Sequence, residues 1–316
     1  MAGEITVKWA NIKNLQSSKS FALIEKKMKL TRKDAVALAP QGAVVADAKE
    51  VTIGGQQIPI TDTSLILPAA DFDKAIHQQP SLLHGWGGTA TAGATLVRAT
   101  EDATTFTGAI ALTRATPTVD WLPPHDRTSI AYNQSYGTTS QSGTPTVKTN
   151  IFHANAERDE YFTPRLFAFG AATFDHNFSE GLNLQQAYGG GIGISLRHTA
   201  KTQLDFKGDI HYQEESFALT APTTPSVNLF GSTFSETFAR HLPKGLVFNE
   251  FGSYSAAWNI TGDYSAHVNG TLLFPVYKGF GFNVGAVDDF LNNAPIGSNK
   301  NSTQFSTGIT YAIKPK

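Results

Sequence analysis

Residues 203–213 read Gln-Leu-Asp-Phe-Lys-Gly-Asp-Ile-His-Tyr-Gln, and two kinds of side chain alternate at every position. The even-numbered residues, from Leu204 to Tyr212, are apolar or glycine, whereas the odd-numbered residues, from Gln203 to Gln213, are polar or charged. Successive side chains of a β-strand point to opposite faces of the sheet. The stretch therefore predicts a strand with one apolar and one polar face, with the length of about 9–11 residues that a tilted transmembrane strand needs.

The same alternation recurs along the chain after Trp86, and residues 264–274 and 304–313 are further clear examples. Bacterial single-chain barrels have an even number of strands. The sheet has to close, because lipid offers no hydrogen-bond partners to the backbone N–H and C=O groups of an open edge strand. We therefore predict an all-β fold with a twelve-stranded antiparallel transmembrane β-barrel. The expected strands begin near residues 86, 104, 126, 146, 163, 182, 202, 226, 244, 263, 279 and 301.

The composition agrees with a sheet that is half polar and half apolar. Charged residues make up 16% of the chain, and the mean hydropathy is −0.19. No run of about 18 apolar residues predicts a membrane-spanning helix. The net charge of −1 gives no reason to expect a nucleic-acid partner. Without cysteine the chain has no disulfides.

The region before the barrel reads as short strands, with Gly54-Gly55 as a hairpin turn signal. A helix candidate from Asp71 to His77 follows, before the alternation begins. No secretory signal peptide is visible at the start, so we expect that it was removed or lies upstream. The expected parts are a small β-domain at 1–68, a linker at 69–84 and the barrel at 85–316.

The connections predict a direction for the barrel. If the first strand runs outward from a periplasmic linker, the long polar loops near 137–146, 214–226 and 290–301 are extracellular. The short turns and the N-terminal domain then lie in the periplasm. Residues 115–125 do not fit this scheme, because they form an unusually long turn for the periplasmic side.

Five segments together resemble a bacterial family of outer-membrane proteins described as salt-induced, whose defining domain is of unknown function. They are Gly85–Gly88, Tyr188–Leu196, Lys201–Phe206, Asp288–Pro295 and Thr303–Tyr311, and the resemblance covers about 85–313. Ala2–Trp9 resembles the middle of an Sm-like, SH3-like β-domain found ahead of some of these barrels, so its first strands are expected upstream. The resemblance implies the outer membrane of a Gram-negative bacterium, a role in the envelope or in the salt-stress response, and outer-membrane lipid and the barrel-assembly machinery as partners.

The polar face of residues 203–213 supplies the candidate functional residues, and we expect Asp205, Lys207, Asp209 and His211 to line the lumen. Asp205, Lys207 and Asp209 sum to −1, which predicts weak cation preference if the barrel conducts. Changing both aspartates to asparagine would leave +1. Glu250 is a further candidate for the lumen. The permeating ion or solute is not specified by these residues.

The sequence predicts a narrow pore or a structural element of the envelope rather than an enzyme, with no catalytic, cofactor-binding or metal-binding residues. One alternative is an outer-membrane lipid hydrolase, for which His153, His176 and Ser179 are available. The other alternative is a soluble β-barrel binding module, which requires apolar side chains inside the barrel and polar side chains outside.

Overall fold

A computed structural model describes residues 13–28, 30–79, 81, 83–98, 101–119, 121–141, 146–177, 182–199, 201–217, 226–292 and 300–315. The chain forms two compact units. The first contains residues 1–80 together with 116–124, and the second contains residues 81–115 together with 125–316. The chain therefore enters the first unit twice.

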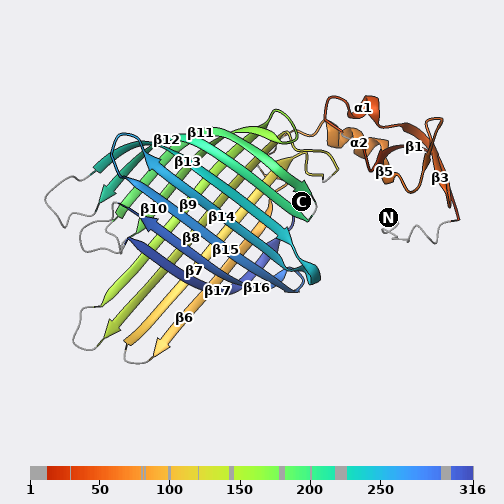
Figure 1. Ribbon diagram of the computed structural model, residues 1–316. Helices are drawn as coiled ribbons and strands as arrows, with labels where there is room; N and C mark the ends of the chain where they lie inside the picture. The colour runs from red at the N-terminus through yellow and green to blue at the C-terminus, as the bar shows by residue number, and fades with distance from the viewer. Residues whose placement is uncertain are drawn as a thin grey trace. The chain divides into compact units, whose positions relative to one another are not determined.

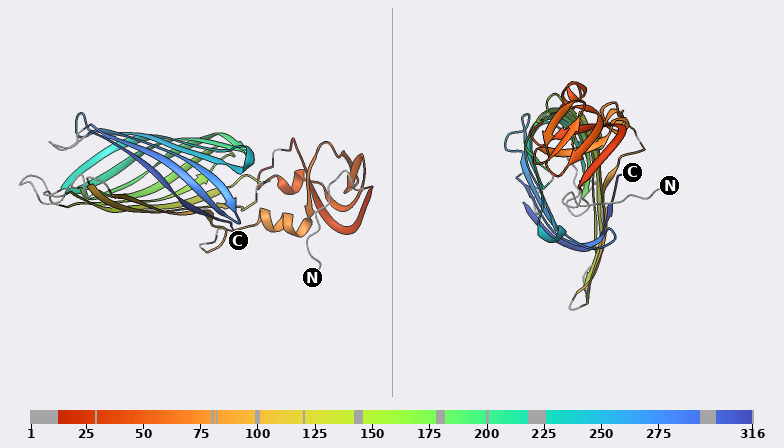
Figure 2. Two further views of the ribbon diagram at one scale, coloured as in Figure 1. Left: turned by 90° about the horizontal axis from the view of Figure 1, so that it is seen from below. Right: turned by 90° about the vertical axis from the view of Figure 1, so that its right-hand side faces the viewer.

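The second unit is a closed barrel of twelve antiparallel strands, each paired with its neighbours in the sequence, with β17 beside β6 at the closure (Figure 1). Seen from below, the strands tilt around a common axis (Figure 2). Each strand begins within three residues of its predicted start, so the predicted fold class is confirmed. The strands are β6 (Gly87–Arg98), β7 (Glu101–Thr116), β8 (Asp126–Gln141), β9 (Val147–Tyr161), β10 (Leu166–Asn177), β11 (Leu182–Thr199), β12 (Thr202–Phe217), β13 (Ser226–His241), β14 (Val247–Ala257), β15 (Tyr264–Tyr277), β16 (Phe280–Leu291) and β17 (Asn301–Ile313).

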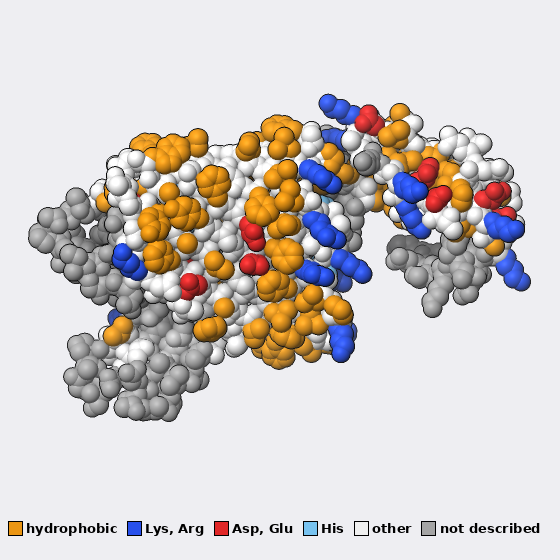
Figure 3. All heavy atoms as spheres, in the orientation of Figure 1, with side chains coloured by type: hydrophobic (Ala, Val, Ile, Leu, Met, Phe, Trp, Pro, Cys, Tyr) orange, Lys and Arg blue, Asp and Glu red, His pale blue; other side chains and the backbone are white. Residues whose placement is uncertain are grey.

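The apolar faces of the barrel strands point outward. On β12, Ile210 is 61% exposed whereas Asp205 is 1% exposed. Phe234 on the neighbouring strand is 67% exposed, and hydrophobic side chains cover much of the visible barrel wall (Figure 3). This arrangement is the inverse of a soluble barrel, in which the apolar side chains fill the interior, so the soluble binding module is wrong. None of the helices in the described residues is both long and apolar enough to cross a membrane.

The first unit is built on a five-stranded curled sheet with the strand order β4-β3-β2-β1-β5 (Figure 1). Gly54 and Gly55, with φ of 57° and 80°, make the predicted hairpin turn between β3 and β4, because a left-handed backbone is easiest for glycine. Residues 2–9, which carry the Sm-like resemblance, lie outside the described residues, and that assignment stays a prediction. The strands are β1 (Asn14–Glu25), β2 (Gln41–Asp47), β3 (Glu50–Ile53), β4 (Gln56–Pro59) and β5 (Thr63–Pro68).

Two apolar clusters stabilise this unit. Consecutive residues of β1 contribute to different clusters, because Leu23 packs with Val44 and Ile53 in one, whereas Ala22 and Ile24 pack in the other. The second cluster also contains residues of the short helices α1 (Ala35–Leu38) and α2 (Ala69–Ile76).

Helix α2 occupies half of the segment 69–84, which is predicted from the sequence to be a linker. Its side chains Phe72 and Ile76 are 1% and 3% exposed. Because these apolar side chains are buried in the core of the first unit, the helix belongs to that unit. Only the residues that follow the helix can act as a linker. Leu83, within that remainder, is 85% exposed.

The segment between β7 and β8 belongs to the first unit and explains the long turn noted at 115–125. Trp121 stacks on Phe72 with ring centroids 5.4 Å apart, and Leu122 is 2% exposed in the same cluster. The backbone N–H of Thr118 donates to Oε1 of Gln78 at 2.9 Å. The turn is long because it supplies part of a core, and not because it extends into solvent.

Candidate functional site: the charged interior of the barrel

An ion pair crosses the interior of the barrel. Nη1 of Arg127 on β8 lies 2.9 Å from Oδ2 of Asp205 on β12, although β9, β10 and β11 separate these strands in the wall. The same guanidinium donates from Nε to Oδ2 of Asp159 on β9 at 2.6 Å. Side chains on strands this far apart around a closed wall meet only through the lumen, so this bridge defines which face is interior.

A second cross-lumen contact lies next to the first. Nζ of Lys207 on β12 donates to both carboxylate oxygens of Glu157 on β9 at 2.7 Å. The Lys207 and Glu157 side chains are 11% and 14% exposed, so little water reaches this contact. Charge-assisted hydrogen bonds in such surroundings are stronger than those between neutral groups.

All four residues proposed for the lumen lie on the interior face of β12. Asp205 and Lys207 join the two contacts described above, and Gln203 also donates to Asp205 at 2.7 Å. Asp209 and His211 form a separate pair, with 2.9 Å between Oδ1 and Nδ1. The structure thus brings the four residues to one face but divides them between two groups.

The glycine-rich strand β11 provides space for this network. A Cβ atom on Gly193 would lie 2.2 Å from Cζ of Phe167, so only glycine leaves room for that ring. The Phe167 ring lies 5.6 Å from the Arg127 guanidinium, and the Phe169 ring lies 5.4 Å from Nζ of Lys207. Aromatic faces attract cations, so the two rings on β10 help to hold the Arg127 and Lys207 side chains in place.

The interior side chains are more exposed toward the end with the long loops. His153 pairs with Asp175 there, and Nδ1 of His267 lies 2.5 Å from Oδ1 of Asp289. These four side chains are 27–46% exposed, whereas Asp159 and Asp205 near the short turns are 1% exposed. The side chains that face the lumen are therefore more accessible to solvent at the loop end than near the short turns of β8–β12, where the charged network lies.

Sequence reasoning missed Arg127, Glu157 and Asp159. Glu157 and Asp159 alternate on β9 as interior charges should, but Arg158 and Glu160 on the opposite face are charged as well and pair at 2.6 Å. Both faces of this part of β9 are therefore charged, and the alternation of residues does not reveal which face is interior. The spacing of Glu157 and Asp159 was the available signal, and only the closed barrel shows that β12 supplies the partners.

Glu250 faces outward, contrary to its suggested place in the lumen. It is the register partner of Gly270 and Phe238 and shares the face of Tyr254, which is 47% exposed.

The side chains named for a hydrolase do not gather at one site. His153 shares the interior face of Asp175, whereas His176, the next residue on β10, projects to the other face and stacks on Phe152. Ser179 lies outside the described residues. In the part of the chain that the structure describes, no group of three or more His, Asp or Glu side chains is arranged to hold a metal ion.

The interior network carries net negative charge. Arg127 and Lys207 contribute +2, whereas Glu157, Asp159, Asp205 and Asp209 contribute −4, which leaves −2 with the histidines neutral. An excess of negative charge attracts cations electrostatically.

Comparison with known proteins identifies the family of this barrel. Residues 90–313 match the family described as "Protein of unknown function, DUF481". Comparison with curated proteins finds no match. Similar solved structures include the β domain of the Bordetella autotransporter BrkA, with 9% identity, coverage of 73% of this chain and 98% of that chain, and a TM-score of 0.37. The translocator domain of the autotransporter NalP from Neisseria meningitidis has 12% identity, coverage of 72% and 87%, and a TM-score of 0.36.

The family match extends over nearly the whole barrel, from the third residue after the start of β6 to the last residue of β17. The chain therefore belongs to the DUF481 family, whose members carry the general description of salt-induced outer-membrane proteins and whose function is unknown.

Proposed function

We propose that the protein is a narrow, cation-preferring pore of the outer membrane, with the N-terminal unit in the periplasm. The observation that carries this proposal is the change in burial along the lumen, from side chains that are 27–46% exposed at the loop end to carboxylates that are 1% exposed near the short turns. A hydrated vestibule above a charged constriction is the arrangement of a selective passage.

The opposite wall of the lumen supports a passage beside the network. Apart from Asp289 at the loop end, the interior positions of β6, β16 and β17 carry small or neutral residues, and Thr91 on β6 hydrogen-bonds Thr310 on β17 at 2.9 Å. Gly285 and Ser306 lie on the same wall, where the Ser306 hydroxyl is 2.9 Å from the position of a Cβ on Gly285. Large charged side chains thus narrow one side of the barrel, whereas hydroxyls line the other.

The orientation follows from the connections. The first unit precedes β6 and also contains the connection between β7 and β8, so both attachments reach the barrel at the end of the short turns. In single-chain outer-membrane barrels the short turns face the periplasm. The first unit is therefore assigned to that compartment.

Conductance of the purified full chain in planar lipid bilayers tests the proposal. We expect small single-channel steps in KCl, and a reversal potential of the sign for K⁺ preference under a salt gradient. The competing account is that the network closes the lumen and the barrel is a structural element of the envelope. Absence of ion-sized conductance from correctly inserted barrels would support that account and overturn the pore.

A further inference from the structure

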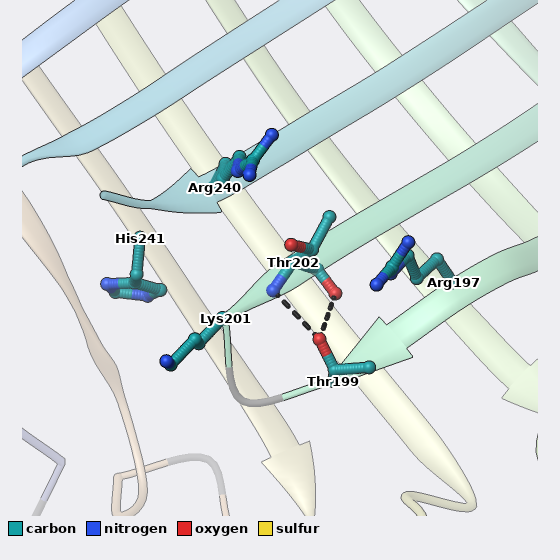
Figure 4. A pocket seen from close by; sticks show the side chains of 6 residues that line it. All are labelled: Arg197, Thr199, Lys201, Thr202, Arg240 and His241. Carbon is teal, nitrogen blue, oxygen red and sulfur yellow. Dashed lines mark hydrogen bonds between the residues drawn. The ribbon is translucent and has the colours of Figure 1, made fainter. Parts of the chain in front are cut away.

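A basic pocket lies on the outer face of the barrel near the short turns of β11–β13. Thr202, the first residue of β12, pairs with Arg240 on β13, and Leu204 pairs with Arg197 on β11. The two arginines thus flank the start of β12 from either side, with Thr199 and Lys201 below them (Figure 4). Arg240 shares the outward face of Phe234, which is 67% exposed.

A β-bulge places Arg197 on this face. The register between β11 and β12 is regular from Leu184 to Ser195, which opposes Asp205 in the interior, and then shifts so that Arg197 opposes Leu204. Leu196 and Arg197 are therefore the two residues that oppose one residue of β12. Without the shift, an odd-numbered residue of β11 such as Arg197 would follow Ser195 to the inside.

The pocket has a polar and an apolar part. Its polar part, about 350 Å³, is lined by Arg197, Thr199, Lys201, Thr202, Arg240 and His241. An adjoining part of about 210 Å³ is lined by Arg197, Thr202, Arg240 and the apolar side chains of Leu204 and Phe238. The shared residues make a continuous surface, which runs from cationic groups near the turns to apolar groups farther up the wall.

The cationic side chains of this pocket form no ion pair in the part of the chain that the structure describes. Among the described residues, no carboxylate forms an ion pair with Arg197, Lys201 or Arg240, and all three are exposed. Two outward carboxylates lie farther up the wall. Glu236 is two same-face positions from Arg240 on β13 and thus about 14 Å away, and Glu250 on β14 is the register partner of Phe238. Lys and Arg side chains collect along this end of the barrel wall (Figure 3).

Described residues of the pocket are joined to one another by hydrogen bonds. Oγ1 of Thr199 accepts from the backbone N–H of Thr202 at 3.0 Å and donates to the Thr202 carbonyl oxygen at 3.1 Å (Figure 4). The backbone N–H of His241 donates to the Lys201 carbonyl at 2.8 Å. Because these contacts use the backbone and a threonine, the guanidinium groups and the ammonium remain available for a ligand.

We propose that this pocket binds the phosphate group of an anionic phospholipid from the leaflet at the short turns. Guanidinium groups match the geometry of phosphate oxygens, and basic groups beside a membrane attract anionic headgroups. An acyl chain then lies along Leu204 and Phe238, which continue the pocket toward the apolar band. A free inorganic anion would make no contact with this apolar part of the pocket. The cationic groups and the apolar surface together therefore favour a lipid as the ligand.

Native mass spectrometry of the purified full chain, released from detergent micelles, tests the proposal. The micelles are doped with dioleoyl phosphatidylglycerol or with the zwitterionic dioleoyl phosphatidylcholine. We expect the barrel to retain phosphatidylglycerol preferentially. The Arg197→Gln/Arg240→Gln variant should lose about 25-fold in affinity, at about fivefold for each charge removed.

Lys278→Asn is the matched control, because Lys278 also lies at this end, in the turn between β15 and β16, but outside the pocket. Asparagine tolerates its φ of 45°. The control should change retention by less than about twofold, since it removes a charge that the pocket does not use. If the double variant does not fold, the two single variants, each expected to lose about fivefold, give the same answer.

Three outcomes would overturn the proposal. Equal retention of the two lipids would exclude recognition of an anionic headgroup. Equal loss in Lys278→Asn and in the arginine variants would mean that only overall charge matters. Displacement of phosphatidylglycerol by millimolar inorganic phosphate, without any effect of acyl-chain length, would assign the pocket to a free anion.

Discussion

Arg127 on β8 and Asp205 on β12 are joined at 2.9 Å across the lumen, although they are 78 residues apart in the sequence. The guanidinium also forms an ion pair with Asp159, so one cation is paired with two carboxylates that are each 1% exposed. Removal of a single partner from such a buried arrangement leaves uncompensated charge.

Arg127→Gln is therefore expected to destabilise the folded barrel by about 3–5 kcal/mol. Urea unfolding of the protein in phospholipid vesicles measures the change. Arg127→Lys is the control, and it should lose less because it keeps the charge while giving up the fork that reaches both carboxylates. A glutamine variant as stable as the wild type would show that the network contributes no net stability.

Ile210→Arg should destabilise the barrel by about 2–4 kcal/mol, because it places a charge on the lipid-facing side of the middle of β12. Ile210 is 61% exposed on the outer face. Ile210→Ala separates the charge from the loss of apolar contact and should cost clearly less. Equal unfolding midpoints for the arginine and alanine variants would contradict the membrane-facing assignment of this strand.

The Asp205→Asn/Asp209→Asn variant should lose cation preference without becoming anion-selective. The two remaining ion pairs, Arg127 with Asp159 and Lys207 with Glu157, have a net charge of zero. If only the residues of β12 determined selectivity, Lys207 would leave a net charge of +1. Reversal potentials in planar bilayers measure this. Asp62→Asn/Asp71→Asn removes the same charge from the first unit and should leave selectivity unchanged.

Two results of that measurement would count against the interpretation. Inversion toward anions would mean that the carboxylates on β9 do not face the permeating ion. Selectivity equal to that of the wild type would remove Asp205 and Asp209 from the conduction path.

Phe72→Ala should destabilise the first unit by about 3–5 kcal/mol, because Phe72 is 1% exposed and stacks on Trp121. In the wild type, chymotrypsin should cut first at the exposed Leu83, with Phe72 and Trp121 protected. In the variant, Trp121 should become a cleavage site while the barrel remains folded. Val36→Ala, at a side chain that is 55% exposed, should leave the wild-type pattern unchanged. Early cleavage at Trp121 in the wild type would contradict its place in this core.

We expect the first unit to lose stability at acid pH when Asp47 is protonated. Its carboxylate accepts hydrogen bonds from the backbone N–H groups of Lys49 at 2.7 Å and Glu50 at 2.9 Å, which lower its pKa from the ordinary value of 3.8. Because the pKa of Asp47 is lower in the folded state, its carboxylate stabilises the folded state fully at pH values above the pKa of the unfolded state. This stabilisation is lost as the pH falls through the pKa of the folded state. Asp47→Ala should flatten the acid side of the urea-unfolding profile of this unit, followed by Trp121 fluorescence. An unchanged profile below about pH 4 would exclude Asp47 as its source.

The barrel was predictable from the sequence because alternation is a local property of a strand. The pattern of residues 203–213 determined that Ile210 faces outward and Asp205 inward, and the turn signals located the twelve strands to within three residues. The hairpin at Gly54-Gly55 was predictable for the same reason, since a left-handed backbone restricts the residue types within the turn itself.

Only the tertiary structure decided which residues meet. Closure of the sheet brings Arg127 to Asp205, and no local pattern relates positions 78 residues apart. Packing in the core of the first unit brings Trp121 onto Phe72, although the two residues are far apart in the sequence. A shift of one residue in strand register, which alternation alone does not predict, turns Arg197 outward to the basic pocket. These contacts depend on how distant strands pack, whereas the strands themselves depend on neighbouring residues.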